Sequence, residues 1–331
     1  MIFSSTRLGF FNLWRVGAEG GAPEWLPVTG GESLIAPSTS ARSGRLVYEQ
    51  WSYEADLWSQ SLDDPDGPAR PLFPSSRWDS HPRFSPTGER IAFTSRRSGT
   101  LAIWLGGANA SAPALWVATG DSFASTLHWS PDGQRLVFSN RRNGEVDLYV
   151  AEGSEVAQRL TRGPAIETNP TWSNDGRWIT FASDRSGRWQ IWQMPASGGE
   201  PSQLTQEGGI YALESIHGER LYFSRHDVPG IWARSPDGTK EELVVDDLSP
   251  RDWGNWLVAE EGIYFVRRQD REATLALWRE QDRRIETVLR FEHPPANPSL
   301  SLSSQRREVL YAWLSRNESD LMWMQLPAAS D

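Results

Sequence analysis

The chain has 331 residues and a formal net charge of −10, from 33 basic and 43 acidic side chains. It has no Cys, which excludes thiolate nucleophiles, disulfides and Cys-based metal sites. The acidic balance argues against direct nucleic-acid binding, whose affinity rests on clustered Lys and Arg. No apolar run reaches the roughly 18 to 20 residues of a membrane helix, and 28 Gly and 22 Pro interrupt the chain too often for long helices. We therefore predict a soluble all-β protein with no membrane insertion.

A hairpin pattern repeats most clearly at residues 81–104, 126–149 and 169–192. Each copy has a short extended segment, a turn ending in Gly, an apolar β-favouring strand, a second turn and a third strand. The turn residues Asn174-Asp175-Gly176 and the apolar run Trp178 to Phe181 show the pattern in the third copy. The pattern predicts a meander of antiparallel strands joined by tight turns.

The pattern runs the length of the chain. An aromatic residue that ends each second strand recurs every 42 to 46 residues, at Phe3, Tyr48, Phe93, Phe138, Phe181, Phe223, Phe265 and Tyr311. The corresponding hairpins are expected near residues 2–14, 46–58, 91–104, 136–149, 179–192, 221–232, 263–278 and 309–323. A short fourth apolar segment follows most of them, and such a four-stranded unit is typical of a β-propeller blade.

We predict one β-propeller domain over residues 1–331, built of four-stranded antiparallel blades. Eight blades are favoured, with imperfect closure, because each end of the chain contributes three strands. Seven blades and an N-terminal hairpin are the alternative. A third hypothesis is that the sequence begins partway through a longer protein, because its first residues already lie in a predicted strand.

The repeat resembles the WD40-like (PD40) propeller repeat of the TolB type. The matching motifs are Trp129-Ser130-Pro131-Asp132-Gly133, Asn169 to Gly176, Ser183 to Gly187, Gly198-Gly199 and Leu204-Thr205. The resemblance is strong over residues 80–205, fair over 44–79 and degraded after 210. It implies the fold more than an activity.

Similar repeats form the propeller halves of prolyl-oligopeptidase-like proteases and the sensor halves of membrane-anchored winged-helix regulators. The resemblance favours the periplasm or cell envelope if the chain belongs to a longer anchored protein. Read as written, the chain is expected to be cytoplasmic.

Motifs for catalysis and cofactors are absent from the sequence. There is no Gly-x-Ser-x-Gly, no dinucleotide or P-loop glycine motif, and the five His are scattered singly. We therefore expect no cofactor and no metal. The alternative is a lyase or hydrolase at the channel mouth, possibly metal-dependent, that uses Asp79, His81 and Glu167; convergence of these three side chains would support it.

Arginines are concentrated in the loops between second and third strands. They are Arg7, Arg96, Arg97, Arg141, Arg142, Arg185, Arg188, Arg225, Arg267, Arg268, Arg271 and Arg316. One interpretation is that they brace loops by pairing with acids such as Asp184, Asp227 and Glu145. The other is that one Arg of each close pair points outward, so that this face binds carboxylates, an acidic peptide or an acidic glycan.

First strands begin at the same face of a propeller as those loops. The expected ligand contacts near the channel mouth are Trp78, Asp79, His81, Thr126, Glu167, Thr168 and Asn169, with Trp78 and Trp189 as stacking surfaces. We interpret the chain as a non-catalytic binding, sensor or scaffold propeller that presents its Arg-rich face to a protein, peptide or glycan partner.

Overall fold

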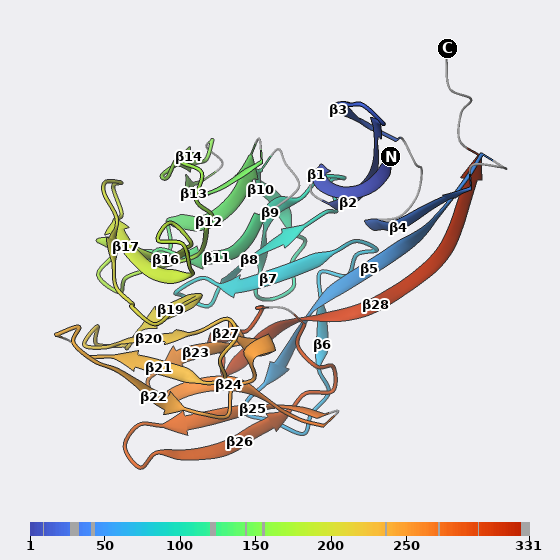
Figure 1. Ribbon diagram of the computed structural model, residues 1–331. Coiled ribbons are helices and arrows are strands. Elements are labelled where there is room, and N and C mark those ends of the chain that lie inside the picture. The colour runs from blue at the N-terminus through green and yellow to red at the C-terminus, as the bar shows by residue number, and fades with distance from the viewer. Residues whose placement is uncertain are drawn as a thin grey trace. The chain divides into compact units, whose positions relative to one another are not determined.

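The protein is described by a computed structural model (Figure 1). It covers residues 1–8, 10–26, 33–40, 44–119, 124–142, 144–153, 156–235, 237–270, 272–296 and 298–325. Within these ranges the chain is almost entirely β-strand, with one short 3₁₀ helix, η1 (Pro250–Asp252). No helix in the described part of the chain is long and apolar enough to span a bilayer. The all-β prediction is confirmed.

The chain divides into two compact units. The larger is Asp56–Trp313, and the smaller combines Met1–Ala55 with Leu314–Asp331. Two long strands, β5 (Arg45–Ser61) and β28 (Glu308–Gln325), contribute residues to both units.

Five consecutive four-stranded antiparallel sheets form most of the larger unit, each with its strands paired in chain order. The first has β7 (Asp79–Phe84), β8 (Arg90–Ser95), β9 (Ala102–Gly107) and β10 (Ala114–Ala118). The second has β11 (Ala124–Trp129), β12 (Arg135–Arg142), β13 (Glu145–Glu152) and β14 (Gln158–Arg159). The third has β15 (Glu167–Trp172), β16 (Trp178–Ser183), β17 (Gln190–Pro195) and β18 (Ser202–Gln203).

The remaining two of these sheets follow the same order. The fourth has β19 (Tyr211–Glu214), β20 (Leu221–Ser224), β21 (Ile231–Arg234) and β22 (Glu241–Val245). The fifth has β23 (Trp256–Ala259), β24 (Gly262–Gln269), β25 (Glu272–Arg279) and β26 (Arg284–Arg290). These repeated four-stranded antiparallel sheets are the propeller-type architecture that the sequence pattern predicts.

Both ends of the chain contribute strands to a further sheet. Its order is β27 (Ser301–Ser303), β28, β5 and β4 (Ser33–Ser40), and β6 (Arg70–Leu72) also pairs with β5. Within the larger unit, the Leu62 amide donates a 2.8 Å hydrogen bond to the Arg307 carbonyl. In this sheet β5, from the N-terminal part of the chain, is thus the neighbour of β28, from the C-terminal part.

The structure differs from the expectation at residues 46–58 and 309–323. Each was expected to be a hairpin, yet each lies within one long strand, β5 or β28. Residues 49–56 and 314–320 contain neither Gly nor Pro, the residues that interrupt strands most strongly, and the chain stays extended there. The strand pairing therefore does not confirm the eight blades that we favoured or the seven of the alternative.

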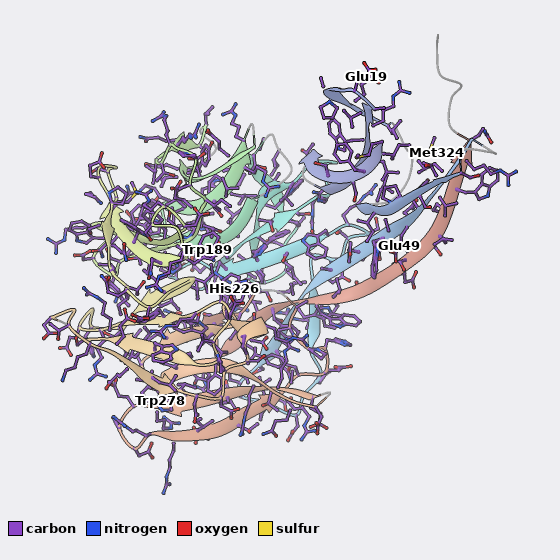
Figure 2. The ribbon with its side chains drawn as sticks, viewed as in Figure 1. Glu19, Glu49, Trp189, His226, Trp278 and Met324 are labelled. Atoms are coloured by element: carbon purple, nitrogen blue, oxygen red, sulfur yellow. The ribbon has the colours of Figure 1, made fainter. Side chains whose placement is uncertain are left out.

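The core of the larger unit rests on its second strands. Phe93, Phe138, Phe181, Phe223 and Phe265, the aromatic markers of the sequence repeat, are all fully buried. Cross-strand neighbours extend the same clusters, including Trp278 of β25, which is 4% exposed (Figure 2). The repeat thus records the apolar faces that each sheet buries.

The turns between first and second strands are held by a Ser–Asp motif. Ser173 Oγ donates to Asp175 Oδ1 at 2.7 Å, and the Arg177 amide donates to the same oxygen at 2.9 Å. Gly176 has φ +69°, a conformation that favours glycine. These bonds lower the pKa of Asp175 to about 2.

The smaller unit has its own sheet and core. Its three-stranded sheet is β1 (Ile2–Leu8), β2 (Phe10–Gly17) and β3 (Gly20–Trp25). Its apolar cluster consists of Leu13, Leu26, Leu34, Leu46 and Tyr48, with Ile2, Met322 and Met324 packed against them.

Candidate functional site

Three first strands of the larger unit share a bulge at the residues expected to face a ligand. His81, Thr126 and Asn169 have φ values of 51°, 35° and 54°. The strand register shifts beside each of them, at Ser80/Arg83, Ser125/His128 and Thr168/Thr171. Bulges with left-handed residues re-aim side chains and occur often at functional sites.

Two of the three bulge residues are brought together. Thr126 Oγ1 donates to Asn169 Oδ1 at 3.1 Å, and Asn169 Nδ2 donates to the Ile210 carbonyl at 2.8 Å. His81 instead places Nδ1 3.2 Å from Thr94 Oγ1 on the neighbouring strand. The Thr126–Asn169 chain links strands β11 and β15 to the start of β19.

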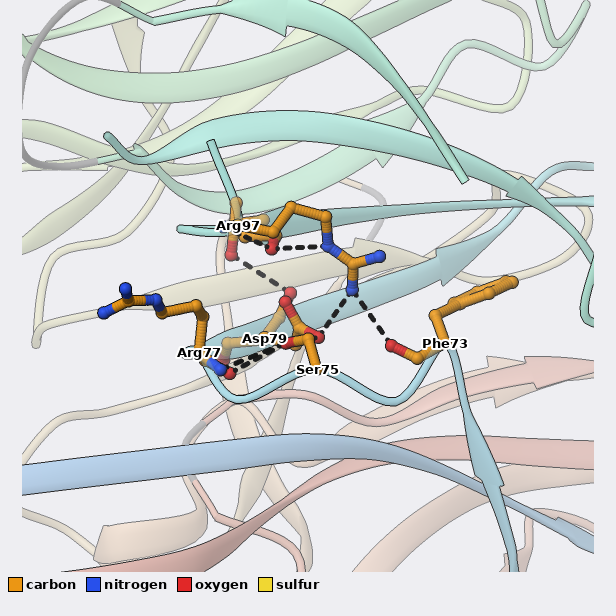
Figure 3. A network of polar contacts seen from close by, with 8 residues as sticks. Phe73, Ser75, Arg77, Asp79 and Arg97 are labelled. Atoms are coloured by element: carbon orange, nitrogen blue, oxygen red, sulfur yellow. Dashed lines mark hydrogen bonds and ion pairs between the residues drawn. The ribbon is translucent and has the colours of Figure 1, made fainter. Parts of the chain in front are cut away.

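A buried acid at the start of β7 binds an arginine of the loop between β8 and β9. Asp79 is 1% exposed, and its Oδ2 accepts hydrogen bonds from Arg97 Nη2 at 2.7 Å and Ser75 Oγ at 2.9 Å. Figure 3 shows Arg97 reaching both this carboxylate and the Phe73 carbonyl, while the Arg77 side chain points away. Burial raises the pKa of Asp79, and its partners Ser95 and Arg97 oppose that rise.

The same arrangement recurs in two other sheets. Arg185 Nη2 lies 2.9 Å from Glu167 Oε1, and Arg268 Nε lies 2.7 Å from Asp252 Oδ2. Burial again raises the pKa of Glu167, with Arg185 opposing. These arginines pair with acids, as one interpretation of the sequence expected; Asp79 and Glu167 lie in first strands, and Asp252 lies in η1. The acids named from sequence bind other groups, such as the Ile166 amide at Asp184.

The other arginines named from sequence have varied surroundings. Arg96 and Arg141 both contact other groups, the Arg96 amide donates to the Trp78 carbonyl, and Arg188 donates to the Gln206 carbonyl. Arg142 and Arg188 are exposed. Trp189 is partly buried against the core cluster of the larger unit (Figure 2). Arg271 and the side chain of Arg7 lie outside the described residues.

The residues of the catalytic alternative have separate partners. Asp79 binds Arg97, Glu167 binds Arg185, and His81 contacts Thr94. Burial, with the charge of Arg83, lowers the pKa of His81 to about 3. In the described ranges no group of three or more His, Asp or Glu side chains is arranged to hold a metal ion.

A central cavity of about 320 Å³ was not anticipated from sequence. Strands β7, β11, β15, β19, β23 and β27, the first strands of successive sheets, all contribute to its lining. Its polar lining includes Arg83, His128, Tyr211, Glu214 and Ser301. A cavity of this size lies at the lower end of the range of small-molecule sites.

Arg83 dominates the electrostatics of this cavity. It is 7% exposed, and its Nη1 donates to the carbonyls of Pro82 and Leu300, each at 3.0 Å. Burial and the charge of Arg83 lower the pKa of His128 to about 4, so this imidazole is neutral at physiological pH. Its Nδ1 accepts a 3.1 Å hydrogen bond from the Trp172 amide, which leaves the proton on Nε2.

Sequence reasoning missed these residues because their short strands hold several polar side chains, so that no single strand sets Arg83 or His128 apart from its neighbours. Aligning the copies offers a signal: Arg83, His128 and Thr171 each stand two residues after a bulge residue, His81, Thr126 or Asn169. This repeat position is polar in all three strands, and two of its residues, Arg83 and His128, line the cavity.

Comparisons with known proteins support the fold. A family model described as the TolB beta propeller domain matches residues 61–246. The Tol-Pal system protein TolB of Bordetella pertussis is 43% identical over 121 residues, which is 36% of this chain and 27% of that protein. The chain thus spans about a quarter of the length of this curated relative.

Solved structures show the same fold at low identity. The crystal structure of TolB from Acinetobacter baumannii has a TM-score of 0.50 at 14% identity, covering 81% of this chain and 66% of that one. A puromycin-hydrolyzing peptidase of Mycobacterium tuberculosis has a TM-score of 0.51 at 17% identity, covering 86% and 50%. At such identities the likeness concerns the fold alone.

Proposed function

The chain belongs to the TolB beta propeller domain family, and from this membership we propose that it is a non-catalytic propeller that binds a protein partner. The observation that carries the proposal is the pairing of buried carboxylates. Asp79 and Glu167, the acids that the catalytic alternative requires, are both bound to arginine. An acid fixed in this way supports a loop and is a poor general base.

The partner surface that we propose is the end of the larger unit carrying the loops between second and third strands. Arg142 and Arg188 are exposed there, whereas Arg97, Arg185 and Arg268 are bound to buried acids. The paired arginines fix the loops, and the exposed ones offer charge to an acidic protein or peptide segment. The ligand contacts expected at Trp78 and Trp189 belong to the same proposal, whereas Thr126 and Asn169 are buried and bond to each other.

The name of the Bordetella relative places that protein in the Tol-Pal system. By analogy we propose a protein partner for this chain rather than a small substrate. An acidic glycan is the alternative ligand of the same arginines, and the test below separates the two.

The test is affinity capture of the partner by two matched double variants. Arg142→Glu with Arg188→Glu reverses charge on the proposed surface, and we expect at least tenfold weaker capture. Arg177→Glu with Arg220→Glu reverses the same charge in the turns between first and second strands, and capture should persist.

Equal capture by both double variants would overturn the proposed surface. Retention of an acidic polysaccharide, with no protein retained by the wild type, would overturn the protein partner. Hydrolase or lyase turnover that is lost in Glu167→Gln would overturn the non-catalytic role.

A further inference from the structure

Among the described residues of the larger unit, one buried charged side chain forms no ion pair. The buried charged residues among those described are Asp79, Arg83, Asp147, Glu167 and Asp252. Each of the four acids pairs with an arginine, at N–O distances of 2.6 to 2.9 Å. Within the described chain Arg83 has no carboxylate in ion-pair range; its Nη1 donates to two backbone carbonyls, and its side chain also contacts the Tyr211 hydroxyl.

An arginine in such a place is costly unless something offsets its desolvation. A buried guanidinium carries five N–H donors and does not deprotonate, so it keeps its charge whatever its surroundings. Carbonyl oxygens satisfy donors but supply no negative charge. The open side of Arg83 is the central cavity that it lines.

The neighbours of Arg83 in the cavity add hydrogen-bond donors without adding charge. His128 is neutral and carries its proton on Nε2. Burial raises the pKa of Tyr211, so its hydroxyl is protonated, and Arg83 acts against that rise. Ser301 accepts a 3.0 Å hydrogen bond from the Phe84 amide, which leaves its own proton to donate.

A single acid lines the same cavity. Glu214 is partly buried, and its Oε2 accepts a 2.8 Å hydrogen bond from the Asn174 amide at the turn after β15. Burial raises the pKa of Glu214, and the Asn174 amide opposes that rise. Glu214 forms no ion pair with Arg83 among the described residues, so the Arg83 guanidinium is not directly neutralised by it.

Apolar side chains also line the cavity, among them Phe84, Trp129, Trp172, Leu213, Leu257 and Leu302. Ser85, Asn174, Ser304 and Gln305 add further polar groups. About 320 Å³ exceeds what a bare inorganic anion fills, since one water occupies about 30 Å³ of liquid. The space suits a molecule with one charged end and an apolar body.

We propose that the central cavity binds a small organic carboxylate, with its carboxylate on the Arg83 guanidinium and its apolar part against Trp129, Trp172 and Leu257. The planar guanidinium fork matches a carboxylate in geometry and charge. This site goes beyond the proposed protein-binding function and does not depend on it.

The test is isothermal titration calorimetry of the full chain with benzoate and with benzamide. The two probes have the same shape and differ in charge, so the proposal predicts that benzoate binds at least tenfold more tightly. Inorganic phosphate, which lacks an apolar body, is expected to bind more weakly than benzoate. Equal binding of benzoate and benzamide, no benzoate binding at millimolar concentration, or phosphate binding as tight as benzoate would each overturn the proposal.

A variant pair locates the site. Arg83→Met should lose benzoate binding, whereas Arg284→Met, at an exposed arginine of β26 outside the cavity lining, should retain it. If Arg83→Met does not fold, Tyr211→Phe removes only a hydroxyl from the cavity and is expected to weaken benzoate severalfold. Unchanged benzoate affinity in the folded cavity variants would place the binding elsewhere and contradict the proposal.

Discussion

Arginines have opposite surroundings in two regions of the larger unit: the end that carries the loops between second and third strands, and the central cavity. Arg97 and Arg185 of the loops and Arg268 near the end of β24 each meet a buried carboxylate. In the cavity, Arg83 is itself buried, and within the described chain it donates to two carbonyl oxygens and pairs with no carboxylate. The comparison shows that arginines concentrated in loops can serve mainly to hold the fold together. A buried arginine without an ion pair, in contrast, marks a place where a negatively charged ligand would neutralise its charge.

The largest expected effect comes from breaking a loop pair. Arg97→Met leaves Asp79, which is 1% exposed, without its counterion. Removing one partner of a buried pair costs about 3–5 kcal/mol in the free energy of unfolding. Urea unfolding at neutral pH measures the loss, and Arg188→Met is the control, expected within about 0.5 kcal/mol of the wild type. A loss under about 1 kcal/mol for Arg97→Met would show that the pair does not stabilise the loop.

The same variant tests how the contribution of Asp79 to the free energy of unfolding changes with pH. Burial raises the pKa of Asp79 above its ordinary 3.8, so the folded state holds this proton more tightly than the unfolded chain does. Its contribution to stability is therefore greatest at low pH and falls as the pH rises from 3.8 through the raised pKa. Without Arg97 the pKa rises further, and the loss extends closer to neutrality.

Urea midpoints of the wild type and Arg97→Met at several pH values between about 4 and 7 check this expectation. The two curves should converge towards low pH and separate as the pH rises. Parallel curves would mean that Arg97 does not act through the Asp79 charge.

A smaller effect is expected at the bulged strands near the cavity. Thr126→Val keeps the β-branched shape but removes the donor to Asn169 Oδ1. Leaving a buried acceptor with one partner fewer costs about 1 kcal/mol in unfolding free energy. Urea unfolding measures it, with Thr239→Val in an exposed turn as the control. A cost equal to that of the control would show that the Thr126–Asn169 bond contributes no stability.

The smallest effect on stability is expected at Arg83. Arg83→Met loses hydrogen bonds to two carbonyls but also removes a desolvated charge with no ion-pair partner. These terms oppose each other, so the free energy of unfolding should change by less than about 1 kcal/mol. A loss of stability as large as that of Arg97→Met would contradict the proposed difference between the paired loop arginines and Arg83.

The repeat made the sheets predictable from sequence. The markers Phe93, Phe138 and Phe181 are buried as the pattern requires, and turns that end in Gly88, Gly133 and Gly176 separate first from second strands. The pattern failed at residues 46–58 and 309–323, where aromatic–aliphatic spacing persists without Gly or Pro and the chain stays extended. Apolar spacing alone therefore identifies strands but does not identify hairpins.

The site was less predictable because its chemistry depends on contacts between distant residues. The sequence indicated the loop arginines and the first-strand residues Asp79 and Glu167 separately, but not that they pair with one another. Taken alone, Arg83 gave no signal because a lone cation in a strand is usually solvated. Its position in the aligned repeat copies, its burial and its place in the cavity lining distinguish it.

The most direct test of this account measures unfolding free energy and benzoate affinity on the same two variants, Arg97→Met and Arg83→Met. The account predicts that Arg97→Met loses stability yet binds benzoate like the wild type, while Arg83→Met keeps its stability and loses benzoate binding. Loss of both properties in both variants, or benzoate binding that survives in Arg83→Met, would contradict the division between structural loop arginines and a ligand-binding cavity arginine.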